Sequence, residues 1–394
     1  MKAGADTTTL KDLIANRYQD KLHRQRRKLH SPCQPIVQFE GRELLSFASN
    51  DYLGLANHRS IRKALTDGVK RWGAGSGASP LISGHFAVHE ELERRLAEHV
   101  GFPRALLFAN GYLANLAIPA AFLDRGDAIF SDKLNHASLV DAARLSFARR
   151  HRYRHLDLDA LESQLANDNV NRRLICSDTV FSMDGDIAPL PQLLTLAEKY
   201  DCWLLLDDAH GFGVLGKNGR GSLAHYGVDY HQRILLVGTM GKAAGVAGAF
   251  VAGSEEAIEW LAQNARTYIY STSPPPATAA ALLKSLQLID KANKRRQLLG
   301  KLIKCFRDGC AHLPWSLASG SSEITPIQPL IVGDNQTALD ISAMLQEHAL
   351  LVPAIRPPTV PSGTARLRVS LSAAHRLVDV ERLLLALHSY CPAS

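Results

Sequence analysis

Short apolar runs alternate with segments of helical spacing between residues 105 and 253 of this chain. Several of these runs are continuously apolar, as in strands that helices cover on both faces. Strands that alternate with helices in this way are typical of a mostly parallel α/β sheet. The predicted strands are Ala105–Ala109, Ala128–Ser131, Leu174–Thr179, Trp203–Asp207, Ile234–Val237 and Ala249–Ala252.

The hydrophobic pattern differs on either side of this region. The amino end predicts a helix from about Leu10 to Leu29, a strand pair within Ile36–Phe47 and a helix from His89 to Val100. A long helical region, Ala277–Phe306, precedes a small α+β pattern. Its predicted strands are Ile327–Val332, Leu350–Ala354 and Ala365–Leu371, and its predicted helices are Thr337–His348 and Val378–His388. We therefore predict an N-terminal segment (1–53), a large α/β domain (54–295) and a C-terminal α+β domain (296–394).

The composition is that of an ordinary globular protein, with 46% hydrophobic and 21% charged residues and a net charge of +7. Many cations lie between residues 21 and 28, where such a run is typical of a solvated helix face. Because no nucleic-acid-binding motif accompanies them, we expect no nucleic-acid partner, and an anionic small substrate explains the charge better. The most apolar long stretch contains Asn110, Gly111, Asn115 and Pro119, so we expect no membrane span.

The chain has six cysteines, with no C-x-x-C pair and no zinc-ligand spacing among them. Cys176 and Cys202 lie in apolar strands and are expected to be buried thiols. The amino end does not have the pattern of a signal peptide. Together these observations predict a cytoplasmic protein without a structural metal.

Polar side chains follow two neighbouring predicted strands at the points where these strands end. Asp207 and His210 follow the first strand, and Thr239 and Lys242 follow the second. Because ligands lie beyond the carboxyl ends of strands in an open parallel sheet, the four side chains should share one crevice. An acid and a lysine on adjacent strands suit pyridoxal phosphate (PLP). The lysine forms a Schiff base with the PLP aldehyde, and the carboxylate keeps the pyridine nitrogen protonated.

Two glycine motifs near this crevice allow other interpretations. Gly211–Gly216 matches G-x-G-x-x-G, but another turn follows it instead of the helix that a dinucleotide site requires. Gly238–Lys242 contains Gly-Lys, but Ala243 stands where a P-loop has the Ser or Thr that binds magnesium. Lys242 by itself would be an ordinary surface lysine. The small residues at 243–248 are what would let a planar cofactor approach the backbone.

Other positions have both a functional and a structural interpretation. Gly111 opens a predicted helix, so the N–H groups there can bind a phosphate, although Tyr112 beside it could simply pack. The hydroxyls of residues 271–273 could bind phosphate or cap a helix. His136 and His210 could each contact a cofactor or be structural histidines.

Four motifs, in order along the chain, resemble the α-oxoamine synthases, which are PLP enzymes of the aspartate aminotransferase fold. The resemblance covers nearly the whole chain and rests on Ser49–Leu55, Phe181–Asp186, Asp207–Gly211 and Thr239–Lys242. It implies the α/β PLP-dependent transferase fold type I, in which a large, mostly parallel sheet of the seven-stranded type is joined to a small C-terminal α+β domain. It also implies a homodimer whose subunits share their active sites.

The resemblance implies a role for each matching residue. Lys242 would bind the cofactor covalently and move the substrate Cα proton, and Asp207 would contact the pyridinium nitrogen. The implied catalytic set is Lys242, His136, Asp207 and His210, with His136 stacked on the ring where substrate binds. The other implied cofactor contacts are Ser182 near the 3′-oxygen, together with His210, then Gly111, Tyr112 and Thr239 at the phosphate, and Ser271 and Thr272 from the second subunit. The implied substrate contacts are Asn50 and Arg368 at the amino-acid carboxylate, and Thr359 and Arg26 (or Arg27) at the acyl group.

Ile355–Pro361, followed by Gly363–Arg368, is most similar to the family members that condense L-alanine with pimeloyl-CoA or pimeloyl-acyl-carrier protein in biotin biosynthesis. A sibling enzyme that uses glycine or serine with another acyl-CoA is the near alternative. A non-catalytic nucleic-acid-binding protein of the same fold is the distant one. Pro80, His85 and Ala243–Ala244 depart from the common family pattern, which concerns the acyl channel and not the cofactor.

Overall fold

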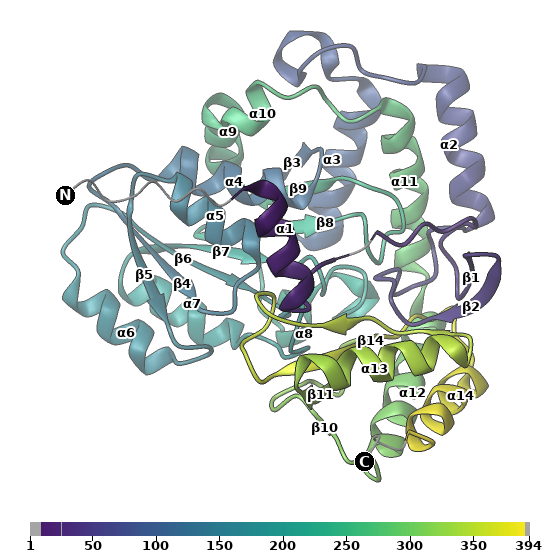
Figure 1. Ribbon diagram of the computed structural model, residues 1–394. Helices are drawn as coiled ribbons and strands as arrows, with labels where there is room; N and C mark the ends of the chain where they lie inside the picture. The colour runs from purple at the N-terminus through teal and green to yellow at the C-terminus, as the bar shows by residue number, and fades with distance from the viewer. Residues whose placement is uncertain (1–8, 25, 391–394) are drawn as a thin grey trace.

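The computed structural model describes residues 9–24 and 26–390 of the chain (Figure 1). Its largest sheet has seven strands: β3 (Arg104–Phe108), β4 (Ala128–Asp132), β5 (Arg149–Tyr153), β6 (Arg173–Asp178), β7 (Cys202–Asp207), β8 (Ile234–Thr239) and β9 (Ala249–Gly253). Their order across the sheet is β3-β9-β8-β7-β6-β4-β5. Neighbours are parallel except at β9, which runs antiparallel to both β3 and β8. The predicted, mostly parallel α/β sheet is confirmed.

The direction of β9 follows from the short segment that precedes it. A parallel return after β8 would need a crossover of about a dozen residues or more. Residues 240–248 alone separate β8 from β9. The chain therefore turns back, and β9 pairs with β8 in the antiparallel sense.

Helices cover both faces of this sheet, which explains why its inner strands are apolar throughout. On one face, Leu205 of β7 packs in a core with α4 (Gly111–Phe122), α5 (Ala137–Leu145) and α9 (Glu255–Asn264). Its neighbour Leu206 points to the opposite face. There it joins a larger core with α3 (Ala87–Val100), α6 (Leu158–Asn167), α7 (Leu190–Lys199) and α11 (Pro276–Asp290).

Strand β5 has no counterpart among the predicted strands. It reads Arg-Arg-His-Arg-Tyr, and Tyr153 is its one buried residue. The strand lies at the edge of the sheet and pairs with β4 alone. Charged side chains are common on edge strands because they prevent pairing with other chains. Apolar periodicity therefore cannot reveal this strand.

The C-terminal region forms a second sheet and lies beside the N-terminal strands (Figure 1). The sheet has the order β10 (Ser316–Leu317), β11 (Ile327–Gly333), β14 (Ala365–Ser370) and β13 (Ala354–Ile355), with helices α12 (Asn293–Cys310), α13 (Asn335–Glu347) and α14 (Leu377–His388). The predicted N-terminal strand pair is present as β1 (Ile36–Phe39) and β2 (Arg42–Ser46). Strand β2 also pairs in parallel with β12 (Leu350–Leu351). The division at residues 53 and 295 stays a prediction.

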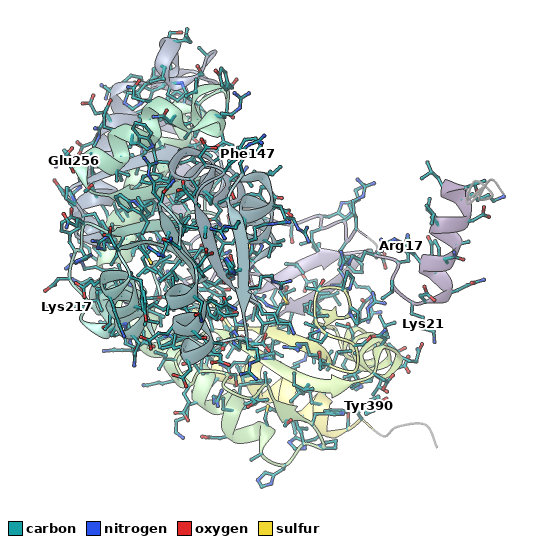
Figure 2. All side chains as sticks on the ribbon, turned by 90° about the vertical axis from the view of Figure 1, so that its left-hand side faces the viewer. Arg17, Lys21, Phe147, Lys217, Glu256 and Tyr390 are labelled. Atoms are coloured by element: carbon teal, nitrogen blue, oxygen red, sulfur yellow. The ribbon has the colours of Figure 1, made fainter. Side chains whose placement is uncertain are left out.

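The helix predicted near the amino end was too long. Helix α1 (Leu10–Gln19) ends well before Leu29, which instead forms an isolated bridge with Phe39. None of the residues of α1 is buried, so no tertiary packing extends it beyond its capped first turns. Figure 2 shows Arg17 of this helix apart from the bulk of the side chains, whereas Lys21, after the helix, contacts Gln336 and Arg356. The predicted helical region 277–306 consists of two helices, α11 and α12, with residues 291 and 292 between them.

Among the described residues, no helix is both long and apolar enough to cross a membrane.

Candidate active site

Two cavities open at the carboxyl ends of the central strands, and together they contain most of the predicted site residues. The small cavity, of about 450 Å³, is lined among others by Gly111, Tyr112, Asn115, Ser138, Asp178, Asp207 and Thr239. The large cavity, of about 920 Å³, is lined among others by Arg24, Ser182, Met183, Thr359, Val360 and Arg368. The two share Asn50, His136, His210 and Lys242. They are therefore two compartments of one site.

Lys242 lies beside His210 at the junction of the two cavities. Lys242 Nζ is 3.1 Å from His210 Nε2, and His210 Nδ1 is 2.7 Å from the Tyr52 hydroxyl. That hydroxyl donates to Asn50 Oδ1 at 3.0 Å, so His210 Nδ1 carries the ring proton and Nε2 accepts from Lys242. Burial, together with the charge of Lys242, lowers the pKa of His210 well below its usual value, and burial also lowers the pKa of Lys242. A neutral imidazole and an easily deprotonated amine result.

Asp207 is held by two donors at the end of β7. Its Oδ2 accepts from Asn115 Nδ2 at 2.6 Å, and its Oδ1 accepts from the Ala209 N–H at 3.0 Å. Asn115 Nδ2 also donates to Ser138 Oγ at 2.8 Å. Sequence analysis assigned no function to Asn115. Its one signal was a polar side chain inside the otherwise apolar helix α4.

His136 is the N-cap residue of α5, and Asp178 at the end of β6 fixes its backbone. The His136 N–H donates to Asp178 Oδ2 at 2.6 Å, and His136 Nδ1 accepts from Ser138 Oγ at 2.7 Å. Burial lowers the pKa of His136. Burial, followed by the charge of Asp207, raises the pKa of Asp178 well above its usual range. Asp178 is a second residue that the sequence did not single out, although it also ends a strand.

Asp208 points away from the cavities and organises the glycine-rich turn that follows. Its Oδ1 accepts from Thr179 Oγ1 at 2.5 Å, and burial raises its pKa to about 6. A Cβ atom on Gly211 would lie 2.1 Å from Asp208 Oδ1, and one on Gly216 would lie 2.6 Å from the Gly221 carbonyl oxygen. Gly211 therefore allows close packing against the buried Asp208 carboxylate, and Gly216 allows close packing within the turn. This agrees with the rejection of a dinucleotide site.

Arg368 on β14 reaches the large cavity from the C-terminal sheet. Its Nε donates to the Ser182 carbonyl oxygen at 2.6 Å, and its Nη1 donates to Asn50 Oδ1 at 3.0 Å and to Ser370 Oγ at 2.8 Å. The same Asn50 oxygen accepts from Tyr52, so one amide joins Arg368 to the His210 network. A guanidinium buried in this way is suited to bind a carboxylate.

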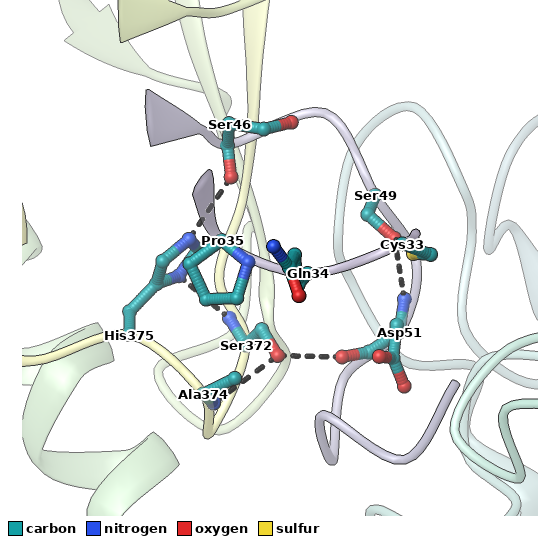
Figure 3. A pocket seen from close by; sticks show the side chains of 9 residues that line it. All are labelled: Cys33, Gln34, Pro35, Ser46, Ser49, Asp51, Ser372, Ala374 and His375. Carbon is teal, nitrogen blue, oxygen red and sulfur yellow. Dashed lines mark hydrogen bonds between the residues drawn. The ribbon is translucent and has the colours of Figure 1, made fainter. Parts of the chain in front are cut away.

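The connector that carries Asn50 is fastened to the C-terminal unit beside a small pocket, shown in Figure 3. Ser372 Oγ donates to the Asp51 carbonyl oxygen at 2.5 Å, and His375 Nε2 donates to the Ser46 carbonyl oxygen at 2.9 Å. The Asp51 carboxylate accepts the Leu55 N–H at 2.7 Å. These contacts fix the relative positions of the connector and of β14, which ends two residues before Ser372.

Comparisons with known proteins agree with this geometry. Residues 42–387 match the family of class I and II aminotransferases. The 8-amino-7-oxononanoate synthase of Herminiimonas arsenicoxydans is 56% identical over 385 residues, which cover 97% of this chain and 98% of the relative. That of Nitrosomonas europaea is 53% identical over 381 residues, or 95% and 96% of the two chains. The chain belongs to the 8-amino-7-oxononanoate synthases.

Solved structures give the same assignment of fold. The 8-amino-7-oxononanoate synthase of Francisella tularensis superposes with a TM-score of 0.76 at 32% identity, over 87% of this chain and 96% of that one. Serine palmitoyltransferase of Sphingomonas wittichii gives a TM-score of 0.92 at 29% identity, over 98% of each chain. A further serine palmitoyltransferase structure, with bound PLP, gives 0.90 at 27% identity, over 96% of each chain. The chain thus has the PLP-dependent transferase fold type I, as predicted.

8-Amino-7-oxononanoate synthases are PLP-dependent acyltransferases, and the residues of the small cavity fit that cofactor. Lys242 and Asp207 line the same cavity, as the aldehyde and the pyridine nitrogen require. Gly111 starts helix α4, where N–H groups lack intrahelical partners. A Cβ atom there would lie 2.4 Å from Thr239 Cγ2, so a larger residue would fill the space between the helix and the Thr239 hydroxyl. Tyr112 also lines this cavity, with its hydroxyl 2.5 Å from Asp141 Oδ2.

Of the basic residues near the amino end, Arg24 lines the large cavity, and the expected contact of Arg26 or Arg27 with the acyl group stays a prediction. Arg24 Nη2 donates to Thr359 Oγ1 at 2.9 Å, and both side chains line the large cavity. Arg26 and Arg27 are exposed and line neither cavity. Helix α1 ends at Gln19, and a turn at Asp20 and Lys21 follows it, so the helix expected through the basic run stops before Arg24.

Ser182 lines the large cavity and not the small one, and its carbonyl oxygen accepts from Arg368, so its expected contact with the cofactor stays a prediction. Ser271 and Thr272 line neither cavity of their own chain. They precede Ser273, whose N–H donates to the Ala78 carbonyl oxygen at 3.0 Å. Their expected contact from a second subunit stays a prediction.

Proposed function

We propose that this synthase condenses L-alanine with a pimeloyl thioester to give 8-amino-7-oxononanoate, CO2 and the free thiol, in biotin biosynthesis. The observation that carries the proposal is the junction of the cavities. There the Lys242 amine, 3.1 Å from a neutral His210, faces a small cavity with Asp207 and a large one with Arg368. The names and the identity of the relatives support the same reaction.

PLP, when bound, accepts the electron pair that remains on the substrate Cα when its proton leaves. We assign the movement of that proton to Lys242 Nζ, since its lowered pKa makes the free amine available. His210 Nε2, an acceptor, would orient this amine. Asp207 would hold the pyridine nitrogen, with its oxygens fixed by Asn115 and the Ala209 N–H. His136 would cover the ring.

The large cavity has the features that the two substrates need. We assign the L-alanine carboxylate to Arg368, helped by Asn50, whose oxygen already accepts from it at 3.0 Å. The apolar part of the lining, which includes Ile355, Val360 and Met183, would contact the methylene chain. Arg24, oriented by Thr359, would bind the carboxylate at the far end of the pimeloyl group.

The first experiment incubates the purified protein with PLP, L-alanine and pimeloyl-CoA and identifies the product by mass spectrometry. We expect 8-amino-7-oxononanoate with L-alanine and not with glycine or serine, and no turnover by the Lys242→Ala variant. Turnover of glycine or serine with another acyl-CoA would support the sibling synthase. Absence of PLP absorbance with salt-sensitive DNA binding would support the nucleic-acid-binding alternative.

We also propose that the synthase is a homodimer in which Ser271 and Thr272 complete the phosphate site of the partner. In support, the neighbouring Tyr270 is 71% exposed and Ile82 is 80% exposed, which is unusual for large apolar side chains. A mixture of Lys242→Ala chains and Ser271→Ala/Thr272→Ala chains should recover activity if sites are shared, because one wild-type site then forms. A cytoplasmic location is proposed from the free thiols of Cys176 and Cys202.

A further inference from the structure

The large cavity carries more positive charge than the proposed reaction uses. Six lysine or arginine side chains line it, and Asp141 is the only carboxylate among its lining residues in the described chain. Lys242 and Arg368 belong to the reacting centre, and Arg24 is assigned to the acyl carboxylate. The cations that remain without a role are Lys133 after β4, Arg144 at the end of α5 and Arg152 in β5.

These three cations belong to adjoining elements, because β4 contacts both β5 and α5. Strands β4 and β5 are paired, and Arg152 Nη2 donates to the Lys133 carbonyl oxygen at 2.8 Å. Arg144 Nη1 lies 3.2 Å from Asp141 Oδ1. Within residues 9–24 and 26–390, Lys133 and Arg152 form no ion pair with a carboxylate. The three side chains, which we call the basic wall, therefore carry a surplus of positive charge.

Side chains alternate along β5, so the residues that pair with Asp168 lie on one face of the strand and Arg152 of the basic wall lies on the other. Arg149 and His151 share one face of the strand. Asp168 pairs with both, at 3.0 Å from Arg149 Nη2 and 2.5 Å from His151 Nε2. Arg152 lies on the other face and lines the cavity. Charged residues on β5 can be explained by protection of the sheet edge. This does not explain why Arg144 of α5 and Lys133 after β4 line the same cavity as Arg152.

A thioester substrate extends in two directions from its carbonyl carbon, and the cavity has cations in two places. In the proposed function the acyl chain ends at Arg24 and Thr359, which do not belong to the basic wall. The thiol half then needs a path of its own. Both possible carriers, coenzyme A and an acyl-carrier protein, present their thiol on a phosphopantetheine arm, which carries a phosphate. Arginine and lysine are the side chains that bind phosphate in proteins.

Resting on the proposed function, we propose that Lys133, Arg144 and Arg152 bind the phosphate of the phosphopantetheine arm and so hold the thiol half of the substrate at the large cavity. The ligand class is a phosphate ester of pantetheine. It is present in coenzyme A, which adds a second and a third phosphate, and in an acyl-carrier protein, which adds its own surface.

The test compares pimeloyl thioesters that differ only in the thiol half: pantetheine, phosphopantetheine, coenzyme A and acyl-carrier protein. The variants are Lys133→Gln, Arg144→Gln and Arg152→Gln, and the control is Lys301→Gln, an exposed cation of α12 outside both cavities. For each phosphorylated thioester we expect each basic-wall variant to raise KM about tenfold with kcat within about twofold, equivalent to about 1.4 kcal/mol. The KM for pimeloyl-pantetheine should not change.

A binding measurement tests the role of the basic wall without requiring turnover. The holoenzyme is titrated calorimetrically with free coenzyme A and with pantetheine. The basic-wall variants should bind coenzyme A about tenfold more weakly than the wild type and the Lys301→Gln control, and added salt should weaken wild-type binding.

The outcomes separate the inference from the proposed function. Two results would refute phosphate binding by the basic wall, even if 8-amino-7-oxononanoate forms. One is unchanged coenzyme A binding in all three variants. The other is a rise in the KM for pimeloyl-pantetheine equal to that for the phosphorylated thioesters. If the variants bind coenzyme A more weakly but the enzyme makes no 8-amino-7-oxononanoate, then the proposed pimeloyl substrate is wrong. The phosphate-binding role of the basic wall would still hold. An effect with phosphopantetheine as large as with coenzyme A assigns the wall to the phosphate that both carriers share. A larger effect with coenzyme A assigns it also to the nucleotide phosphates.

Discussion

Replacement of His155 by glutamine should destabilise the synthase at neutral pH and have much less effect near pH 10. His155 lies between two loops that carry site residues, with Nδ1 3.0 Å from Asp132 Oδ1 and Nε2 2.6 Å from Asp186 Oδ2. Both ring nitrogens can donate to these carboxylates only when the ring is protonated. Burial by itself lowers the pKa of His155, but the bonds to the two carboxylates outweigh it and raise the pKa to about 10.

The size of the effect follows from this change in pKa. A rise from 6.5 to about 10 corresponds to about 5 kcal/mol at about 1.4 kcal/mol per pKa unit. The His155 side chain is 25% exposed, and solvent screening reduces the contribution to about 2–4 kcal/mol. Because the folded pKa lies above the unfolded one, this stabilisation is fully present below pH 6.5. It declines as the pH rises from 6.5 to 10.

The assay is urea denaturation of the wild type and His155→Gln at pH 6.0, 8.0 and 10.0. The difference in free energy of unfolding should be about 2–4 kcal/mol at pH 6.0 and should shrink steadily toward pH 10.0. His231→Gln is the matched control, because among the described residues His231 pairs with one carboxylate, Glu198 at 3.1 Å, and its Nδ1 accepts from the Arg233 N–H. A His155→Gln difference that stays constant with pH would show that His155 acts through packing and not through its charge.

Two further predictions concern the ends of the site. Gly111→Ala would place a methyl group 2.4 Å from Thr239 Cγ2. Because overpacking costs about 1–3 kcal/mol, this variant should bind PLP about tenfold or more weakly in an absorbance titration. Wild-type affinity for PLP would contradict the assigned phosphate position. Arg24→Gln should raise the KM for pimeloyl-CoA about tenfold through loss of one charged contact beside Thr359, with Arg26→Gln as the matched control. A larger effect of Arg26→Gln would restore the assignment made from the sequence.

The central strands and their polar ends were predictable because both properties are local. Continuous apolar runs identified β6, β7 and β8, and the residues after them necessarily meet at one edge of a parallel sheet. For this reason Asp207, His210, Thr239 and Lys242 were expected in one cavity, and they line one. Strand β5 was missed because it is a charged edge strand.

Features that depend on where the chain goes after an element ends were not predictable in the same way. Arg26 was named from the family resemblance, within a helix expected to reach about Leu29, whereas α1 ends at Gln19 and Arg24 contacts Thr359. Nothing local shows where such a helix stops, because none of its residues is buried. The contact joins residues 335 positions apart, so it exists only in the assembled fold.

Asn115 illustrates the same limit and gives the last prediction. Its Nδ2 donates to Asp207 Oδ2 at 2.6 Å across 92 residues of sequence, and this bond holds the carboxylate that would contact the pyridine nitrogen. Asn115→Ala should lower kcat about tenfold, which corresponds to an activation free energy higher by about 1.4 kcal/mol. The KM for L-alanine should change little. Asn167→Ala is the control, since within the described residues that side chain bonds only to Ser163 on its own helix, α6.

Asn115→Asp should be more damaging than Asn115→Ala, because it places a second carboxylate beside Asp207. Two buried carboxylates at this distance cannot both ionise, and one of them keeps a proton up to higher pH. The variant should therefore show a kcat that rises with pH over a range in which the wild type is flat. If Asn115→Ala keeps wild-type kcat and Asn115→Asp shows no such rise, then Asp207 does not depend on Asn115, and the backbone N–H of Ala209 is sufficient to hold it.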